Sequence, residues 1–198
     1  MRIVAAQQSG QFHFASRERA HTEIAVADAF GAGNGDVQIY RPLERSLCNF
    51  LAGQKLGKGL VDWMDRRRRT PLLIMELQAL DQAIGDLTEC TLLPSTSSLA
   101  NAWGCIYVLE GSTLGGQTLT RHLRIACPEL SQSEPSFLNP YGSQTGPMWR
   151  EFCDDLVQYH QQTLAPDDEA KAIILAAKQT FQCYGDWLAK AFSQDGGQ

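Results

Sequence analysis

The strongest structural signal in the sequence is Trp103-Gly-Cys-Ile-Tyr-Val-Leu-Glu-Gly-Ser-Thr-Leu-Gly-Gly-Gln117. Its apolar residues recur with the spacing of an α-helix, and the pattern predicts one long amphipathic helix from Leu99 to about Ala126. Three glycines, Gly111, Gly115 and Gly116, stand near its middle, where each costs roughly 1 kcal/mol relative to alanine. We therefore expect an interruption there, so that bare backbone lies against a flat ligand or a neighbouring helix.

Helical periodicity also dominates the rest of the chain, and strand-like alternation is nearly absent, so we predict an all-α fold. Further helices are predicted over Ser16 to Phe30, Arg41 to Leu51, after Thr70, over Met148 to Leu164 and after Pro166. Gly31 to Gly35 should end the first of them, and we predict a loop from Gly31 to Asp36. Thr70 followed by Pro71 favours a helix start, because threonine caps amide groups and proline at the first position loses no hydrogen bond. The apolar stripes predict burial of Leu43, Leu47, Leu73, Leu77, Trp103, Ile106, Tyr107, Leu119, Leu123 and Ile173.

The composition favours a folded, helical protein of ordinary size. A chain of 198 residues can bury a core without outside staples, and we expect one domain over residues 1–198 with flexible ends at 1–12 and 193–198. With 43% hydrophobic and 20% charged residues, neither a disordered nor a membrane class is favoured. The net charge of −5 argues against nucleic acid as a partner, because phosphate binding needs clustered lysine and arginine.

Three features predict a cytoplasmic protein. Apolar runs such as Cys105 to Leu109 fall far short of the ~20 residues that cross a bilayer, so we expect no membrane partner. The amino terminus is polar where a signal peptide would be continuously apolar. The six cysteines show neither C-x-x-C pairs nor zinc-ligand spacing and are expected to be reduced thiols.

The basic run from Arg66 to Arg69 stands out in an acidic chain. A cluster of this size is usually a solvated turn, and for that reason it does not revive a nucleic-acid function. A second interpretation is a basic surface patch that steers an acidic partner protein toward the molecule.

Three segments, in the same order along the chain, resemble bacterial haem oxygenases, particularly those associated with phytochromes. Tyr107 to Gln117 resembles the distal helix of that family, and Asp62 to Leu73 resembles its tryptophan, arginine-rich turn and following leucine-rich helix. Tyr141 to Trp149 is similar to the loop that leads into its next helix. The resemblance implies the multi-helix bundle of haem oxygenases as the fold.

The resemblance also implies a distal haem face on the glycine-rich helix. Gly111, Gly115 and Gly116 would line that face and bind the cofactor, and Gly111, Ser112 and Gly115 would serve the chemistry. Ser112 stands where the animal enzymes have an aspartate that organises distal water. Ser112, backbone groups or another side chain would hold that water here, and the sequence leaves this choice open.

The same resemblance implies His21 as the iron ligand. Arg19-Ala-His-Thr-Glu-Ile24 resembles the proximal pattern of the family and lies on the first predicted helix. A neutral imidazole is a common haem-iron ligand, whereas a lone helical histidine is otherwise a surface or capping residue. Arg17, one turn earlier on the same face, could pair with a haem propionate or remain solvated.

Two aromatic residues complete the implied cofactor site. Tyr107 could reach a propionate, although plain packing is the simpler role for it. Phe181, on the last helix, could pack against the macrocycle, although an aromatic at this spacing is more often ordinary core.

The family would cleave haem, as both cofactor and substrate, with O2 and electrons to biliverdin, CO and Fe2+. Electrons would come from an acidic ferredoxin- or flavodoxin-type donor, and a phytochrome could accept the biliverdin. One alternative is a haem carrier or sensor of the same fold that does not turn over. Another is a cofactor-free helical interaction module, or an enzyme of the related fold acting on a thiamine-like compound.

Overall fold

The computed structural model describes residues 18–79, 88–126 and 136–195, with side chains described from residue 35 onward except at 66, 123, 124, 126 and 191–195. All regular structure in these ranges is helical, which confirms the predicted all-α fold. The elements are α2 (Glu18–Leu51), α3 (Lys58–Asp62), the π-helical turn η1 (Trp63–Arg67), α4 (Thr70–Ala79), α5 (Leu99–Ala126), the 3-10 turn η3 (Gly142–Gln144), α6 (Thr145–Gln162) and α7 (Pro166–Asp195).

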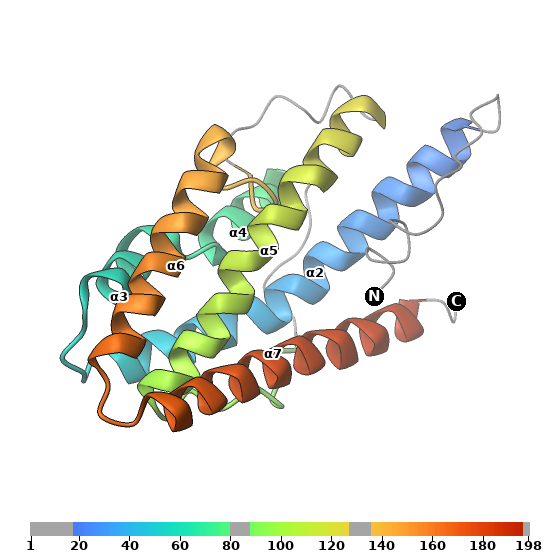
Figure 1. The fold of residues 1–198 in the computed structure, drawn as a ribbon. Helices are drawn as coiled ribbons and strands as arrows, with labels where there is room; N and C mark the ends of the chain where they lie inside the picture. Colours follow the sequence, from blue (N-terminus) through green and yellow to red (C-terminus); the bar gives the residue numbers. More distant parts are fainter. Residues whose placement is uncertain (1–17, 80–87, 127–135, 196–198) are drawn as a thin grey trace.

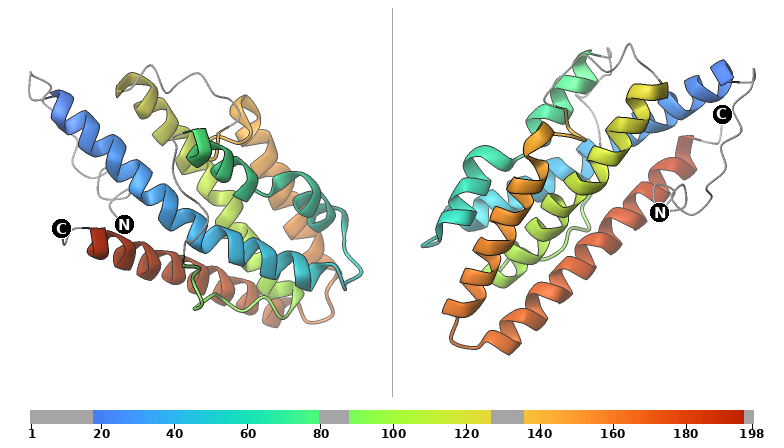
Figure 2. Two further views of the ribbon diagram at one scale, coloured as in Figure 1. Left: turned by 180° about the vertical axis from the view of Figure 1, so that it is seen from behind. Right: turned by 45° about the horizontal axis from the view of Figure 1, so that its top comes forward.

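Helix α5 lies at the centre of the bundle, with α6 along one side, α7 along another and α2 behind them (Figure 1). Seen from behind, α2 runs between α5 and α7 and contacts α4 (Figure 2). The core lies between these helices, and the predicted burial is confirmed for Leu43, Leu47, Leu73, Leu77, Trp103, Ile106 and Ile173. The predicted burial of Tyr107 is wrong, because its ring packs on Trp149 at the edge of the bundle and is 39% exposed. Leu119 is half-buried, and the side chain of Leu123 is not among those described. Among the described residues, no helix is long and apolar enough to cross a membrane.

Helix α2 is continuous where the sequence predicts two helices. The predicted interruption at Gly31 to Gly35 is wrong, because the helix passes through it from Glu18 to Leu51. Val37, Ile39 and Leu43, which follow the glycines, are fully buried. Burial of three large aliphatic side chains outweighs the roughly 1 kcal/mol that each helical glycine costs.

Pro42 lies inside α2 and has a specific structural consequence. Proline has no N–H, so the carbonyl of Gln38, four residues earlier, loses its usual helical partner. The backbone N–H of Cys90 donates to that carbonyl at 2.8 Å. The extended segment that precedes α5 is thereby attached to α2, and Glu89 reinforces the attachment through Arg41 at 2.8 Å and Arg45 at 2.5 Å.

Helix α4 begins at Thr70, as predicted, but the cap is different from the one expected. The Thr70 hydroxyl has no hydrogen-bond partner among the described residues. The carboxylate of Glu44 on α2 instead accepts from the backbone N–H groups of Arg69 at 2.8 Å and Thr70 at 3.2 Å. A long-range side chain thus does what a local threonine was expected to do.

Helix α5 is also uninterrupted, so the predicted break at its central glycines is wrong. Gly104, which lies outside that group of glycines, lies directly against α7. A Cβ at this position would collide with the carbonyl of Ile173 and lie 2.7 Å from the Cβ of Ala176. Gly104 therefore lets α5 and α7 touch backbone to backbone.

The last two helices follow the prediction closely. Helix α6 begins three residues earlier than the predicted Met148, at Thr145, and ends at Gln162. Helix α7 begins at Pro166 with Asp167, Asp168 and Glu169 in its first turn, and it continues to Asp195. The five cysteines whose side chains are described are free thiols, consistent with the expected reduced state: Cys48, Cys90, Cys105, Cys153 and Cys183.

Candidate functional site

The three central glycines of α5 face three different environments. A Cβ at Gly111 would lie 3.5 Å from the ring of Trp149 on α6. A Cβ at Gly116 would collide with the carbonyl of Leu138, so this glycine accommodates a neighbouring chain segment. A Cβ at Gly115 would meet nothing within 4 Å. Bare, open backbone of the kind that a flat ligand could cover is therefore found at Gly115.

Ser112, one turn before Gly115, belongs to a hydrogen-bonded chain between α2 and α5. Arg69 donates from Nη2 to Tyr40 Oη at 2.7 Å and to Ser112 Oγ at 2.9 Å. Tyr40 Oη and Ser112 Oγ are 3.2 Å apart, and Ser112 Oγ donates to the carbonyl of Leu109 at 2.8 Å. Because arginine has only donors and the carbonyl only accepts, Tyr40 donates to Ser112, and the chain has one direction.

Arg69 is the fixed charge of this network. Its side chain is 3% exposed, and its guanidinium lies 4.9 Å from the ring centroid of Tyr40 and 5.4 Å from that of Phe137. It also donates to the carbonyl of Leu109. Burial alone would lower the pKa of Arg69, but Tyr40 and Glu110 hold that pKa above its usual value. Burial raises the pKa of Tyr40, so its hydroxyl keeps its proton at neutral pH.

The opposite face of α5 carries a second, closed network around Glu110, which is 1% exposed. Arg67 donates to Asp62 at 2.7 Å, Glu151 at 2.9 Å and Glu110 at 3.4 Å, and so joins α3, α5 and α6. Tyr141 donates to the same Glu110 carboxylate at 3.1 Å. Burial raises the pKa of Glu110, whereas Arg69 and Arg67 lower it.

The two networks correct the interpretation of the basic run. Arg67 and Arg69 are buried, and their guanidinium groups point into the bundle, so the expected solvated turn or basic patch is wrong for these two. Arg68 is exposed. Buried carboxylates and hydroxyls supply the physical reason, because they offer the guanidinium groups better partners than a turn in water would.

Asp36 also belongs to the candidate site, although the sequence predicted a loop at this residue. It lies on α2 one turn before Tyr40 and is partly exposed. Burial raises the pKa of Asp36 from 3.8 to about 7, against an opposing effect of Arg69. Its spacing of four residues from Tyr40 is the signal that could have placed it on the same helical face, had α2 been predicted as one helix.

Tyr184 of α7 completes the polar cluster. Its ring packs edge to face on Tyr40, with centroids 5.3 Å apart, and its buried hydroxyl has no hydrogen-bond partner among the described residues. A buried hydroxyl without a partner is costly, and it is usually explained by a ligand or water. Tyr184 thus marks the same region as Asp36, Tyr40 and Ser112.

The structure places the other predicted residues as follows. Tyr107 packs on Trp149 with centroids 5.3 Å apart and is 39% exposed, on the same side of α5 as Gly111. Phe181 is 61% exposed rather than part of the core. Arg17 lies outside the described residues, and His21 lies on α2 with a side chain that is not among those described.

His21 and Gly115 are not brought together by the described backbone. His21 precedes Tyr40 by 19 residues, which is about 28 Å along a helix that rises ~1.5 Å per residue. Gly115 lies only one turn from the Tyr40–Ser112 contact. A straight α2 therefore holds His21 several turns away from the open backbone of α5.

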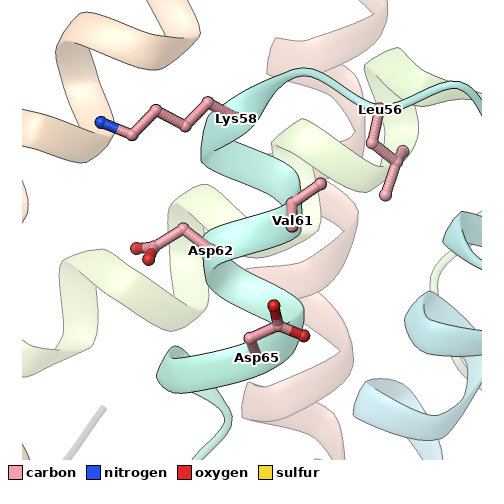
Figure 3. Close-up of a pocket in the computed structure, with 5 residues that line it drawn as sticks. All are labelled: Leu56, Lys58, Val61, Asp62 and Asp65. Carbon is pink, nitrogen blue, oxygen red and sulfur yellow. The ribbon is translucent and has the colours of Figure 1, made fainter.

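One pocket lies elsewhere, at α3 and η1. It has a volume of about 300 Å³ and is lined by Leu56, Lys58, Val61, Asp62 and Asp65 (Figure 3). Asp62 is engaged by Arg67. The residues that line this pocket belong neither to the Ser112 network nor to the glycines of α5, so the pocket is not part of the candidate site.

Comparisons with known proteins give one finding. A curated protein from Xanthomonas campestris pv. campestris (strain 8004), named "Heme oxygenase", is 33% identical over 151 residues, which cover 72% of this chain and 87% of that protein. No family model matches the chain. No solved structure matches it either.

Proposed function

Because this chain belongs to the haem oxygenase family, we propose that it degrades haem with dioxygen and reducing equivalents, releasing biliverdin, carbon monoxide and ferrous iron. One observation carries the proposal at the level of residues. Open backbone at Gly115 adjoins a hydroxyl at Ser112 that Tyr40 and Arg69 hold in place. A flat ligand and a positioned proton-carrying group can therefore meet on one face of α5.

Two features of the described residues are compatible with a haem. Glycine backbone permits close approach of a planar ring, and the backbone at Gly115 is open, while the exposed rings of Tyr107 and Phe181 are available for aromatic contacts. When bound, haem supplies the iron that reduces dioxygen and the ring carbon that is oxidised. The protein supplies orientation, exclusion of side reactions and protons.

Ser112 and Tyr40 handle protons in this proposal. Burial keeps the Tyr40 hydroxyl protonated against the opposing effect of Arg69, and the chain from Arg69 through Tyr40 to Ser112 fixes the direction of the hydrogen bonds. Fixed donors need no reorganisation during a reaction, which is the general advantage of preorganised polar groups.

His21 remains our proposed iron ligand, with Arg17 beside it for a propionate. For His21 to face Gly115, α2 must bend between His21 and Tyr40. Helices bend most readily at glycines, and Gly31, Gly33 and Gly35 lie in that interval. The proposal therefore includes a bend at these glycines when haem binds.

The finer features of the reaction are proposed on the family alone. The cytoplasmic enzyme would receive electrons from an acidic ferredoxin- or flavodoxin-type protein and could pass biliverdin to a phytochrome. Among the arginines of the basic run whose side chains are described, Arg67 and Arg69 are buried and Arg68 is exposed, so Arg68 is available to such an electron donor.

The test combines spectroscopy with turnover. Hemin is added to the wild type, to His21→Ala and to His122→Ala, an exposed histidine on α5 that serves as the matched control. A Soret band and, with reductant under air, a biliverdin band in the wild type and the control, both altered in His21→Ala, support the proposal. A stable ferrous haem complex without biliverdin would establish a carrier or sensor instead, and absence of any Soret band would refute haem as the ligand.

A further inference from the structure

Asp36 and Gly115 lie on the same side of the contact between α2 and α5. The two helices run in opposite directions, and the amino end of α2 lies near the carboxyl end of α5 in every view (Figures 1 and 2). Tyr40 and Ser112 join them at 3.2 Å. Asp36 is one turn before Tyr40 and Gly115 is one turn after Ser112, so both extend from this contact in the same direction.

The polar groups that interact with Asp36 come from three parts of the chain. Tyr40 lies on α2, Arg69 precedes α4, and Tyr184 lies on α7. The buried hydroxyl of Tyr184, which has no partner among the described residues, belongs to the same group. Asp36 is itself partly exposed, so its carboxyl group can exchange protons with solvent.

We propose that Asp36 is the acid that supplies protons to oxygen reduced in the open space beside Gly115. In each transfer, the carboxyl O–H bond of Asp36 breaks, an O–H bond forms on the reduced oxygen, and the carboxylate keeps the electron pair. Solvent water then returns a proton to Asp36. The electrons that reduce the oxygen come from the electron-donor protein, so this inference rests on the proposed function.

The acid–base properties of Asp36 agree with this role. Burial raises its pKa to about 7, so the carboxyl group is partly protonated at neutral pH and can both give and regain a proton. Catalytic acids are most effective when their pKa lies near the working pH. An ordinary surface aspartate would be ionised and would have no proton to give.

The first experiment uses the protein without haem. A raised pKa in the folded state means that the folded protein holds its proton while the unfolded chain releases it, so stability falls as pH rises from about 4 to about 7. The melting temperature of the wild type should fall over this range more than that of Asp36→Asn. Asp155→Asn is the matched comparison: the pKa of Asp155 on α6 is also raised, so its removal should also reduce the fall in melting temperature, but it should leave the turnover profile below unchanged. Equal pH dependence in wild type and Asp36→Asn would overturn the inference.

The second experiment measures biliverdin formation against pH. The wild-type and Asp155→Asn rates should fall as pH rises above about 7. Asp36→Asn should be slower by ~10²-fold at neutral pH and should lack that fall, with partial recovery in Asp36→Glu. An unchanged profile in Asp36→Asn overturns the role of Asp36 alone. A wild type that binds haem without forming biliverdin overturns the proposed function as well, whatever the haem-free protein shows.

Discussion

Each of two faces of α5 contacts a buried arginine, but the surroundings of the two arginines differ. On one face, Arg67 meets three carboxylates in a closed network around Glu110. On the other face, Arg69 meets two hydroxyls and a carbonyl next to open backbone at Gly115. The difference shows that burial of an arginine is not itself a sign of function, because what matters is whether its partners face a space that a ligand can enter.

The largest loss of stability should come from removing Arg67 from the Glu110 network. Arg67→Ala removes the arginine that forms an ion pair with the buried Glu110, and loss of one partner from a buried ion pair costs ~3–5 kcal/mol. Urea unfolding should show a loss of this size, while Arg68→Ala, at an exposed neighbour, should stay within ~0.5 kcal/mol of wild type. Similar losses for the two variants would contradict the assignment of Arg67 to a structural network.

The next effect separates two adjacent glycines. Gly116→Ala forces a Cβ against the carbonyl of Leu138 and should destabilise the protein by ~1–3 kcal/mol. Gly115→Ala meets open space and should stabilise it by up to ~1 kcal/mol through helix propensity.

The same pair also tests the ligand face. A methyl group at position 115 would stand between the backbone and a bound ring, so haem affinity in a Soret titration should fall by at least ~10-fold, about 1.4 kcal/mol. A more stable Gly115→Ala protein with unchanged haem affinity would show that haem lies elsewhere.

A smaller loss of stability is expected at Ser112. Ser112→Ala removes one hydrogen bond each from Arg69 and Tyr40 and should lower the free energy of unfolding by ~1 kcal/mol. Biliverdin formation should fall by ~10²-fold if Ser112 positions a proton, with haem affinity little changed. Ser143→Ala, at an exposed position in η3, is the control, and parallel loss of binding and turnover in Ser112→Ala would indicate a merely structural role.

The smallest effect should come from the surface. The pKa of Glu89 is lowered by its hydrogen bond to Arg45, with further contributions from Arg41. Its contribution to stability is therefore present above the pKa of the unfolded chain and is lost as pH falls through the folded value. Glu89→Gln should cost no more than ~0.5 kcal/mol at neutral pH and nothing in acid, as measured by urea unfolding. A loss above that size would make this pair more than a surface contact.

Local signals in the sequence were sufficient for several elements. Periodicity and the Pro166 start predicted α5 and α7 well, because both depend on residues close together in the chain. The continuity of α2 could not be predicted, since burial of Val37 and Ile39 is a tertiary effect that outweighs local glycine propensity.

The candidate site was predicted only in part. The glycines and Ser112 followed from one motif, but Arg69 and Ser112 are 43 residues apart, and nothing local shows that an arginine run turns inward. Asp36 was missed because the sequence predicted a loop there, and a spacing of four residues from Tyr40 indicates a shared face only within a helix. The sequence also cannot distinguish Gly115, which is open, from Gly116, which lies against Leu138, because the difference depends on a neighbouring segment of the chain.

The bond from Cys90 to the carbonyl of Gln38 has a consequence for how such proteins diverge. Both atoms belong to the main chain, so evolution can replace either side chain without losing the link, provided that position 90 keeps its N–H. Pro42 is the residue whose identity creates the vacancy. A search for covarying side chains would therefore miss this attachment. The only residue in the sequence that indicates it is Pro42, which cannot donate the helical hydrogen bond to the carbonyl of Gln38.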